Sequence, residues 1–142
     1  IEEELALLSE KMEGVTKMHA EPEEKIFALI YTHLSIIRET VLRNGSLRAE
    51  FFRDIWMVEK FRRTFDAKEH RILQLVLQEG IDKGRFRIEN VGLMTDIIHY
   101  SVKGLEVPYI YDRLGDGLTE DETYPIVRGI LVRVLNMPPA LD

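Results

Sequence analysis

The side chains of this 142-residue sequence that can do chemistry are scattered, and the pattern nearest to a metal site is Asp96-Ile97-Ile98-His99. It places a carboxylate and an imidazole one helical turn apart, and histidines stand at positions 19, 33, 70 and 99. Di-metal helical bundles need a Glu-x-x-His motif on each of two helices, and the sequence has none. We therefore expect no metal and no cofactor.

Nucleophilic and phosphate-binding motifs are also missing. No Gly-x-Ser-x-Gly surrounds any of the four serines, at positions 9, 35, 46 and 101. The Gly80-x-x-x-Gly84 pair has no Lys-Ser/Thr after it, as a phosphate-binding loop requires, so we interpret these glycines as the end of a helix. An enzyme built on buried carboxylates needs acids on apolar faces, and nearly all acids here fall on polar sides. The sequence predicts a protein that is not an enzyme.

The composition of the chain restricts the kinds of partner that it can bind. The chain has 25 acidic and 19 basic residues, a net charge of −6, and no cysteine. This sign is wrong for a module that neutralises phosphates unaided, so the basic cluster of Lys60, Arg62 and Arg63 is read as a solvated helix face. The sequence contains no uncharged run of 18 residues that could span a membrane. We expect a cytoplasmic protein that does not bind DNA or membranes by itself.

Hydrophobic spacing predicts an all-α single domain over residues 1–142. Asp66-Ala67-Lys68-Glu69 and Thr119-Glu120-Asp121-Glu122 have capping-box spacing, and Asn90 can cap a helix. Asn44-Gly45-Ser46 and Val107-Pro108 are breaks, and residues 108–118 read as a loop. Six helices result, over residues 2–19, 22–43, 47–64, 66–80, 90–107 and 119–137.

Aromatic side chains are concentrated in the third of these helices, which suggests the lining of a cavity. We expect an effector pocket where this helix faces the second one, with His33 or Tyr100 supplying polar groups. The alternative, that these aromatics are simply core, is equally compatible with their spacing. The candidate ligand-binding residues are Phe27, Tyr31, Leu34, Phe51, Phe52, Trp56, Phe61 and Tyr100.

Short motifs at the predicted helix ends resemble those of a known family. The Gly80 and Gly84 pair, Phe86, the Asn90 cap and Gly104-Leu105 together resemble the regulatory domain of tetracycline-repressor-type (TetR family) transcription regulators. The resemblance implies a six-helix bundle that binds a small-molecule effector and dimerises. It also implies an N-terminal helix-turn-helix domain, absent from this chain, to which the first helix would connect.

The same resemblance implies a homodimer in which the last two long helices pair with their copies. Residues 124–137 agree with this physically, because they are apolar over more than half of the helix circumference. The predicted interface residues are Met94, Ile97, Ile98, Ser101, Leu105, Ile126, Val127, Ile130 and Val134.

The leading hypothesis is thus a homodimeric repressor-type regulatory domain whose largely apolar effector shifts the first helix and so changes the DNA affinity of the absent domain. The alternative is a helical protein-interaction bundle with a dry core and no ligand pocket. A cavity distinguishes the two. The sequence does not specify the effector, the operator, or whether the regulator represses or activates.

Overall fold

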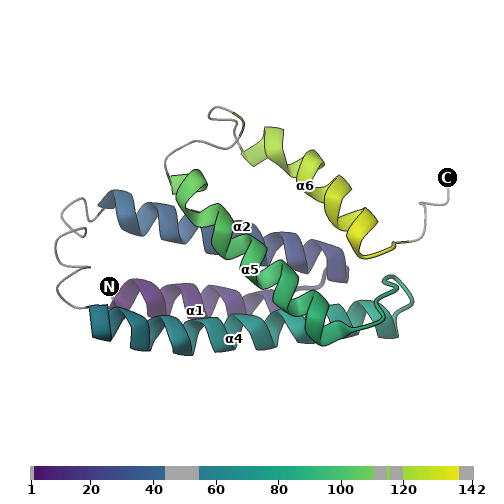
Figure 1. The fold of residues 1–142 in the computed structure, drawn as a ribbon, viewed down its shortest axis with the longest axis horizontal. Helices are drawn as coiled ribbons and strands as arrows, with labels where there is room; N and C mark the ends of the chain where they lie inside the picture. The colour runs from purple at the N-terminus through teal and green to yellow at the C-terminus, as the bar shows by residue number, and fades with distance from the viewer. Residues whose placement is uncertain (1, 44–54, 111–114, 116–119, 138–142) are drawn as a thin grey trace.

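A computed structural model describes residues 2–43, 55–110, 115 and 120–137, which form five helices (Figure 1). They are α1 (Glu2–Thr16), α2 (Pro22–Arg43), α4 (Ile55–Asp82), α5 (Val91–Ile110) and α6 (Glu120–Val134). These ranges contain no strand, so the all-α prediction is confirmed for the described part of the chain. The count of six helices and the TetR-type arrangement are not confirmed.

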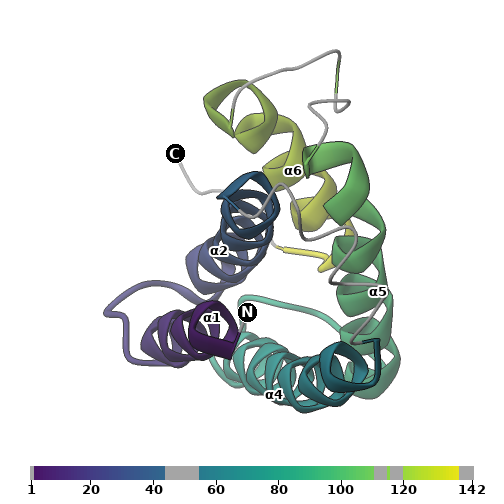
Figure 2. The ribbon, with the colours of Figure 1, turned by 90° about the vertical axis from the view of Figure 1, so that its left-hand side faces the viewer.

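Helix α2 lies at the centre of the bundle. In Figure 2, α1 and α4 run side by side, α2 and α5 pack on them, and α6 lies against α2 and α5. The apolar face of α2 is wide enough to contact α1, α4 and α5, as its sequence predicts. Its buried core residues include Ile26, Phe27, Ile30 and Leu34. Pro22 begins the helix, where a missing backbone N–H costs nothing.

The predicted break before Asp66 is wrong, because α4 runs without interruption from Ile55, inside the expected third helix, through the expected fourth helix to Asp82. A capping box marks a helix start only where something ends the preceding helix, and no glycine or proline occurs between Gly45 and Gly80. The Asp66 carboxylate instead accepts a hydrogen bond from Lys103 Nζ of α5. The predicted break at Asn44-Gly45-Ser46 lies outside the described residues.

The turn after α4 depends on two glycines, as predicted, although the helix continues past Gly80 to Asp82. The backbone N–H groups of Arg85 and Phe86 both donate to Gly80 O, at 2.8 and 3.1 Å. Gly84 takes the left-handed conformation, with φ 72°, that suits glycine. The Phe86 ring is buried directly against Gly80, where a side chain would have no room.

Helix α5 begins as predicted and ends later than predicted. Leu93 N donates to Asn90 Oδ1 at 3.0 Å, which confirms the N-cap. The helix then passes through Pro108 and reaches Ile110. Pro108 deprives the Gly104 carbonyl of its helical donor, but Gly104 is exposed and water can replace that donor. Tyr109 therefore lies in the last helical turn and not in a loop.

Helix α6 is attached mainly through its two ends. Near its start, Tyr124 Oη donates to Glu24 Oε2 at 2.9 Å, and the Tyr124 ring packs on Phe27 with centroids 5.0 Å apart. Just past its end, Leu135 is fully buried and its carbonyl accepts from Arg87 N at 3.0 Å. Between these two points Leu131 is buried in the core and Val127 packs against it, while Ile126, Ile130 and Val134 stay exposed.

The contact between Gly80 and Phe86 predicts an unusual cost for a small substitution. An alanine Cβ at position 80 would stand 2.0 Å from the Phe86 ring, which is buried and cannot swing away. We expect Gly80→Ala to lower the free energy of unfolding by about 1–3 kcal/mol in urea denaturation, despite the better helix propensity of alanine. Gly14→Ala is the control. Gly14 lies in α1 with nothing near its Cβ position, so its replacement should leave stability equal or higher.

Candidate functional site: an apolar pocket above a buried charge cluster

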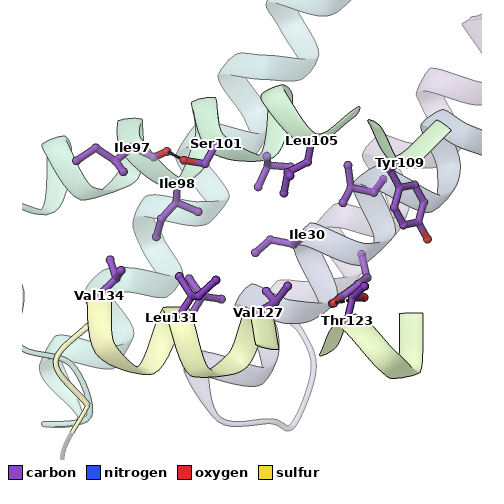
Figure 3. A pocket seen from close by; sticks show the side chains of 14 residues that line it. Ile30, Ile97, Ile98, Ser101, Leu105, Tyr109, Thr123, Val127, Leu131 and Val134 are labelled. Atoms are coloured by element: carbon purple, nitrogen blue, oxygen red, sulfur yellow. Dashed lines mark hydrogen bonds between the residues drawn. The ribbon is translucent and has the colours of Figure 1, made fainter. Parts of the chain in front are cut away.

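A pocket of about 300 Å³ lies between α2, α5 and α6. In Figure 3, side chains of α5 and α6 approach from opposite sides, and Ile30 of α2 lies between them. The volume is at the lower end of the range for small-molecule sites. The lining residues are Ile30, Tyr31, Leu34, Ile97, Ile98, Ser101, Val102, Leu105, Tyr109, Thr123, Val127, Ile130, Leu131 and Val134.

Helical periodicity explains how three separate segments build this lining. On α5 the series Ile97, Ser101, Leu105 and Tyr109 advances by four residues, which keeps one face toward the pocket. Lining residues on α6 and on α2 recur likewise at steps of three and four. The walls are therefore three amphipathic faces that do not fully meet.

The pocket opens to solvent along one side. Three of its large hydrophobic lining side chains are also well exposed, namely Ile97 at 49%, Ile130 at 55% and Val134 at 39%. Leu93, Tyr100 and Ile126 extend this exposed surface along the same two helices. We call these six residues the α5/α6 apolar face.

A cluster of buried charged groups lies behind the pocket wall. His33 of α2 is 1% exposed and is bonded at both ring nitrogens, by Glu69 of α4 at Nδ1 and by Glu106 of α5 at Nε2, 2.8 Å away. His99 of α5 contacts the second Glu69 oxygen through Nδ1, at 3.1 Å. We call His33, Glu69, His99 and Glu106 the histidine cluster. It joins three helices in one hydrogen-bonded unit.

Two groups of this cluster, His33 and Glu69, have shifted pKa values. Burial opposes the charged imidazolium, but hydrogen bonds to Glu106 and Glu69 outweigh it and raise the pKa of His33 to about 9. Burial likewise favours the neutral acid of Glu69, yet its bonds to His33 and His99 hold the pKa of that carboxyl below its usual range. His33 is therefore a cation held between carboxylates at neutral pH.

None of the four cluster residues lines the pocket, although Leu34 and Leu105, next to His33 and Glu106 in sequence, do. The cluster therefore fixes the relative positions of the α2 and α5 walls and does not face a ligand. Among the described residues no group of His, Asp and Glu side chains could hold a metal ion. The arrangement supports binding of a ligand, and the charged side chains of the histidine cluster do not take part in the pocket lining.

The structure separates the predicted ligand-binding residues. Tyr31 and Leu34 line the pocket, whereas Phe27 is in the core and Tyr100 is 67% exposed on the α5/α6 apolar face. His33, suggested as a polar group of the pocket, lies behind its wall. Phe51 and Phe52, and the side chains of Trp56 and Phe61, lie outside the described residues.

The predicted dimer residues differ in their exposure. Ile97, Ile126, Ile130 and Val134 are exposed on the α5/α6 apolar face. Of the remaining residues, the buried Ile98 and the half-buried Leu105 and Val127 line the pocket, Met94 packs on the core, and Ser101 is exposed at the pocket edge. The interface itself stays a prediction.

Sequence reasoning missed the histidine cluster, because it placed nearly all acids on polar sides. That premise fails for Glu69 and Glu106, and also for Glu23, which is 3% exposed and paired with Arg85. A signal existed. Glu69 lies four residues after Phe65 and four before Leu73, both buried, and Glu106 lies four after the buried Val102. A glutamate on an apolar stripe predicts a buried partner.

The histidine cluster predicts a large effect for one substitution. His33→Leu would leave two buried carboxylates without their cation, so we expect it to lower the free energy of unfolding by about 3–5 kcal/mol. The triple variant with Glu69→Gln and Glu106→Gln should recover most of that loss, because neither of the two carboxylates then remains without its cation. As a control, His70→Leu removes a half-exposed partner of Asp96 and should cost no more than about 1 kcal/mol. Equal losses for His33→Leu and the triple variant would contradict this account.

The same cluster predicts how stability depends on pH. The pKa of His33 is raised from 6.5 to about 9, so its contribution is complete below pH 6.5 and is lost as pH rises through 9. The pKa of Glu69 is lowered, so its contribution is present above its ordinary value and is lost on acidification. We expect the free energy of unfolding to be greatest near pH 5–6 and to fall by about 3 kcal/mol toward pH 9.5. Urea titrations across this range measure it, and the triple variant should lack the alkaline decline.

Comparisons of the chain with known protein families, with curated proteins and with solved structures found no match. None of the helices in the described ranges is both long enough and apolar enough to cross a membrane. The function of the chain must therefore be argued from its pocket, its apolar face and its charge cluster.

Proposed function

We propose that this chain is the effector-binding and dimerisation domain of a TetR-type transcription regulator. The observation that carries the proposal is the apolar pocket between α2, α5 and α6, which adjoins an exposed apolar face on two of the same helices. The resemblance of the helix-end motifs to TetR-type regulatory domains is the basis for proposing a transcription regulator. The pocket supports effector binding, and the exposed apolar face supports dimerisation.

The pocket supports ligand binding over a simple interaction bundle. A bundle that only presents its outer surface packs its interior densely, with few voids larger than a water molecule. Here about 300 Å³ remains between three helices whose side chains converge on it. Such a volume is large enough for a small organic molecule, which would bury the aliphatic walls that are otherwise exposed to solvent.

The distribution of exposed hydrophobic side chains supports the homodimer. Six of the nine large hydrophobic side chains that are exposed in the described residues belong to the α5/α6 apolar face. Charge on α6 is also self-complementary, with Asp121 and Glu122 in its first turns and Arg133 in its last. An antiparallel pairing of α6 with its copy about a two-fold axis would bring these opposite charges together around Ile126 and Ile130.

Helix α2 provides a path from the pocket to α1. Ile30, Tyr31 and Leu34 line the pocket, and α2 also packs against α1, whose Met12 and Val15 are in the same core. In the proposed regulator a helix-turn-helix domain is joined to α1, and the bound effector favours one position of that helix. A coupling free energy of about 1–3 kcal/mol would change operator affinity about 5- to 150-fold.

The dimer is tested by sedimentation equilibrium. We expect a mass of about 33 kDa, twice the 16.6 kDa of the chain, at micromolar concentration. Ile130→Glu should shift the mass to that of the monomer, because it places a carboxylate in the centre of the apolar face.

Leu75→Glu is the matched control, since Leu75 is 59% exposed on α4, away from the apolar face. It should leave the dimer intact. A wild-type monomer, or a dimer that Leu75→Glu disrupts and Ile130→Glu does not, would refute the proposed interface. A monomer would leave the interaction bundle as the better account of the exposed side chains.

A further inference from the structure

The charge around the pocket restricts what it can bind. Each of the described residues that line it is aliphatic, aromatic or hydroxyl-bearing, and none carries a charge. Two charged groups close to the lining are already engaged. Glu106 is bonded to His33 behind the wall, and the Arg38 guanidinium stacks on the Tyr109 ring, 5.6 Å from its centroid. A charged ligand group would lose its hydration here without gaining a partner.

The two ends of the pocket differ in polarity. At one end Tyr31 Oη and Thr123 Oγ1 lie 3.2 Å apart, and Tyr109 approaches from the last turn of α5. The other end, near Ile97 and Val134, is aliphatic (Figure 3). A hydroxyl group has one donor and two acceptor positions, so a bonded pair of hydroxyls can still accept from a ligand.

The pocket is also elongated. Its lining on α5 extends from Ile97 to Tyr109, which at the rise of an α-helix corresponds to about 18 Å along the axis. Between these two ends the α5 lining carries one hydroxyl, that of Ser101, which donates to the carbonyl of Ile97 at 2.6 Å and belongs to an exposed side chain at the pocket edge. The long wall is therefore suited to a hydrocarbon chain.

We propose that the pocket binds a neutral aliphatic molecule with one small hydroxyl-type head group, which lies at Tyr31 and Thr123 with its chain extending toward Ile97 and Val134. The inference rests on the proposed function in one respect, that the pocket is a binding site. It adds the electrical neutrality of the ligand, its linear shape and its orientation.

Three probes of equal chain length test the neutrality. We would titrate the 142-residue chain with octanol, octanoate and octylammonium at pH 7 by isothermal calorimetry. Octanol should bind at least tenfold more tightly than either ion, because only the ions bring an uncompensated charge into the pocket. Octanoate binding as tightly as octanol would overturn the inference, since it would mean that a cation such as Arg38 reaches the ligand.

Orientation is tested by removing single hydroxyls. Thr123→Val keeps the shape of the side chain and should weaken octanol about fivefold, without changing the binding of chlorooctane, which donates no hydrogen bond. Ser101→Ala is the matched control and should leave octanol affinity unchanged, because Ser101 lies at the exposed pocket edge, beside the proposed chain and not at the proposed head-group position. Loss of octanol affinity only in Ser101→Ala would reverse the proposed orientation.

A pair of valines on α6 separates failure of this inference from failure of the proposed function. Val127 lines the pocket and Val132 does not, so Val127→Phe should abolish octanol binding while Val132→Phe preserves it. Circular dichroism and melting temperature would establish that both variants fold. If none of the probes binds the wild type, or if Val127→Phe binds octanol normally, the pocket is not a ligand site and the proposed function fails with it.

Discussion

The arrangement of the bundle depends on a buried cation, the imidazolium of His33, held between Glu69 and Glu106. Each partner comes from a different helix, so the charges can be satisfied only when α2, α4 and α5 take one relative position. Apolar packing tolerates small sliding, whereas a buried charge without its partner costs several kcal/mol. The raised pKa of His33 keeps that cation in place at neutral pH. The cluster thus specifies the geometry even where it adds little net stability.

The pocket follows from the contrast between this fixed group of helices and α6. Helix α6 has no share in the histidine cluster. It is held near its start by Tyr124 and just past its end by Leu135. Between these points its side chains meet those of α2 and α5 across a gap that Leu131 only partly fills. Fixed walls on one side and an end-anchored helix on the other leave a volume that can be filled without disturbing the core.

Local signals in the sequence predicted the elements well and the site poorly. Helix content, the Asn90 cap and the glycine turn before Phe86 depend on residues close in sequence, and the structure has all three. The break at Asp66 failed because a start signal was read without a stop signal. The histidine cluster joins residues up to 73 positions apart, so spacing could not reveal the pairing. The expected pocket relied on aromatic side chains, and the observed one is mostly aliphatic because α5 and α6 supply its walls.

The position of the histidine cluster also bears on how a ligand could act at a distance. Helix α2 contributes His33 to the cluster and Leu34 to the pocket, so a ligand in the pocket would contact the residue next to the cation. The cluster resists any movement of α2 relative to α4 and α5, and a ligand that shifted α2 alone would strain the two hydrogen bonds of His33. Movement is less costly if α2, α4 and α5 turn together against α6. In the proposed regulator, effector binding would therefore displace α1 by rotating α2, α4 and α5 as one body. The size of that rotation would be set by how far the ligand separates α6 from α5.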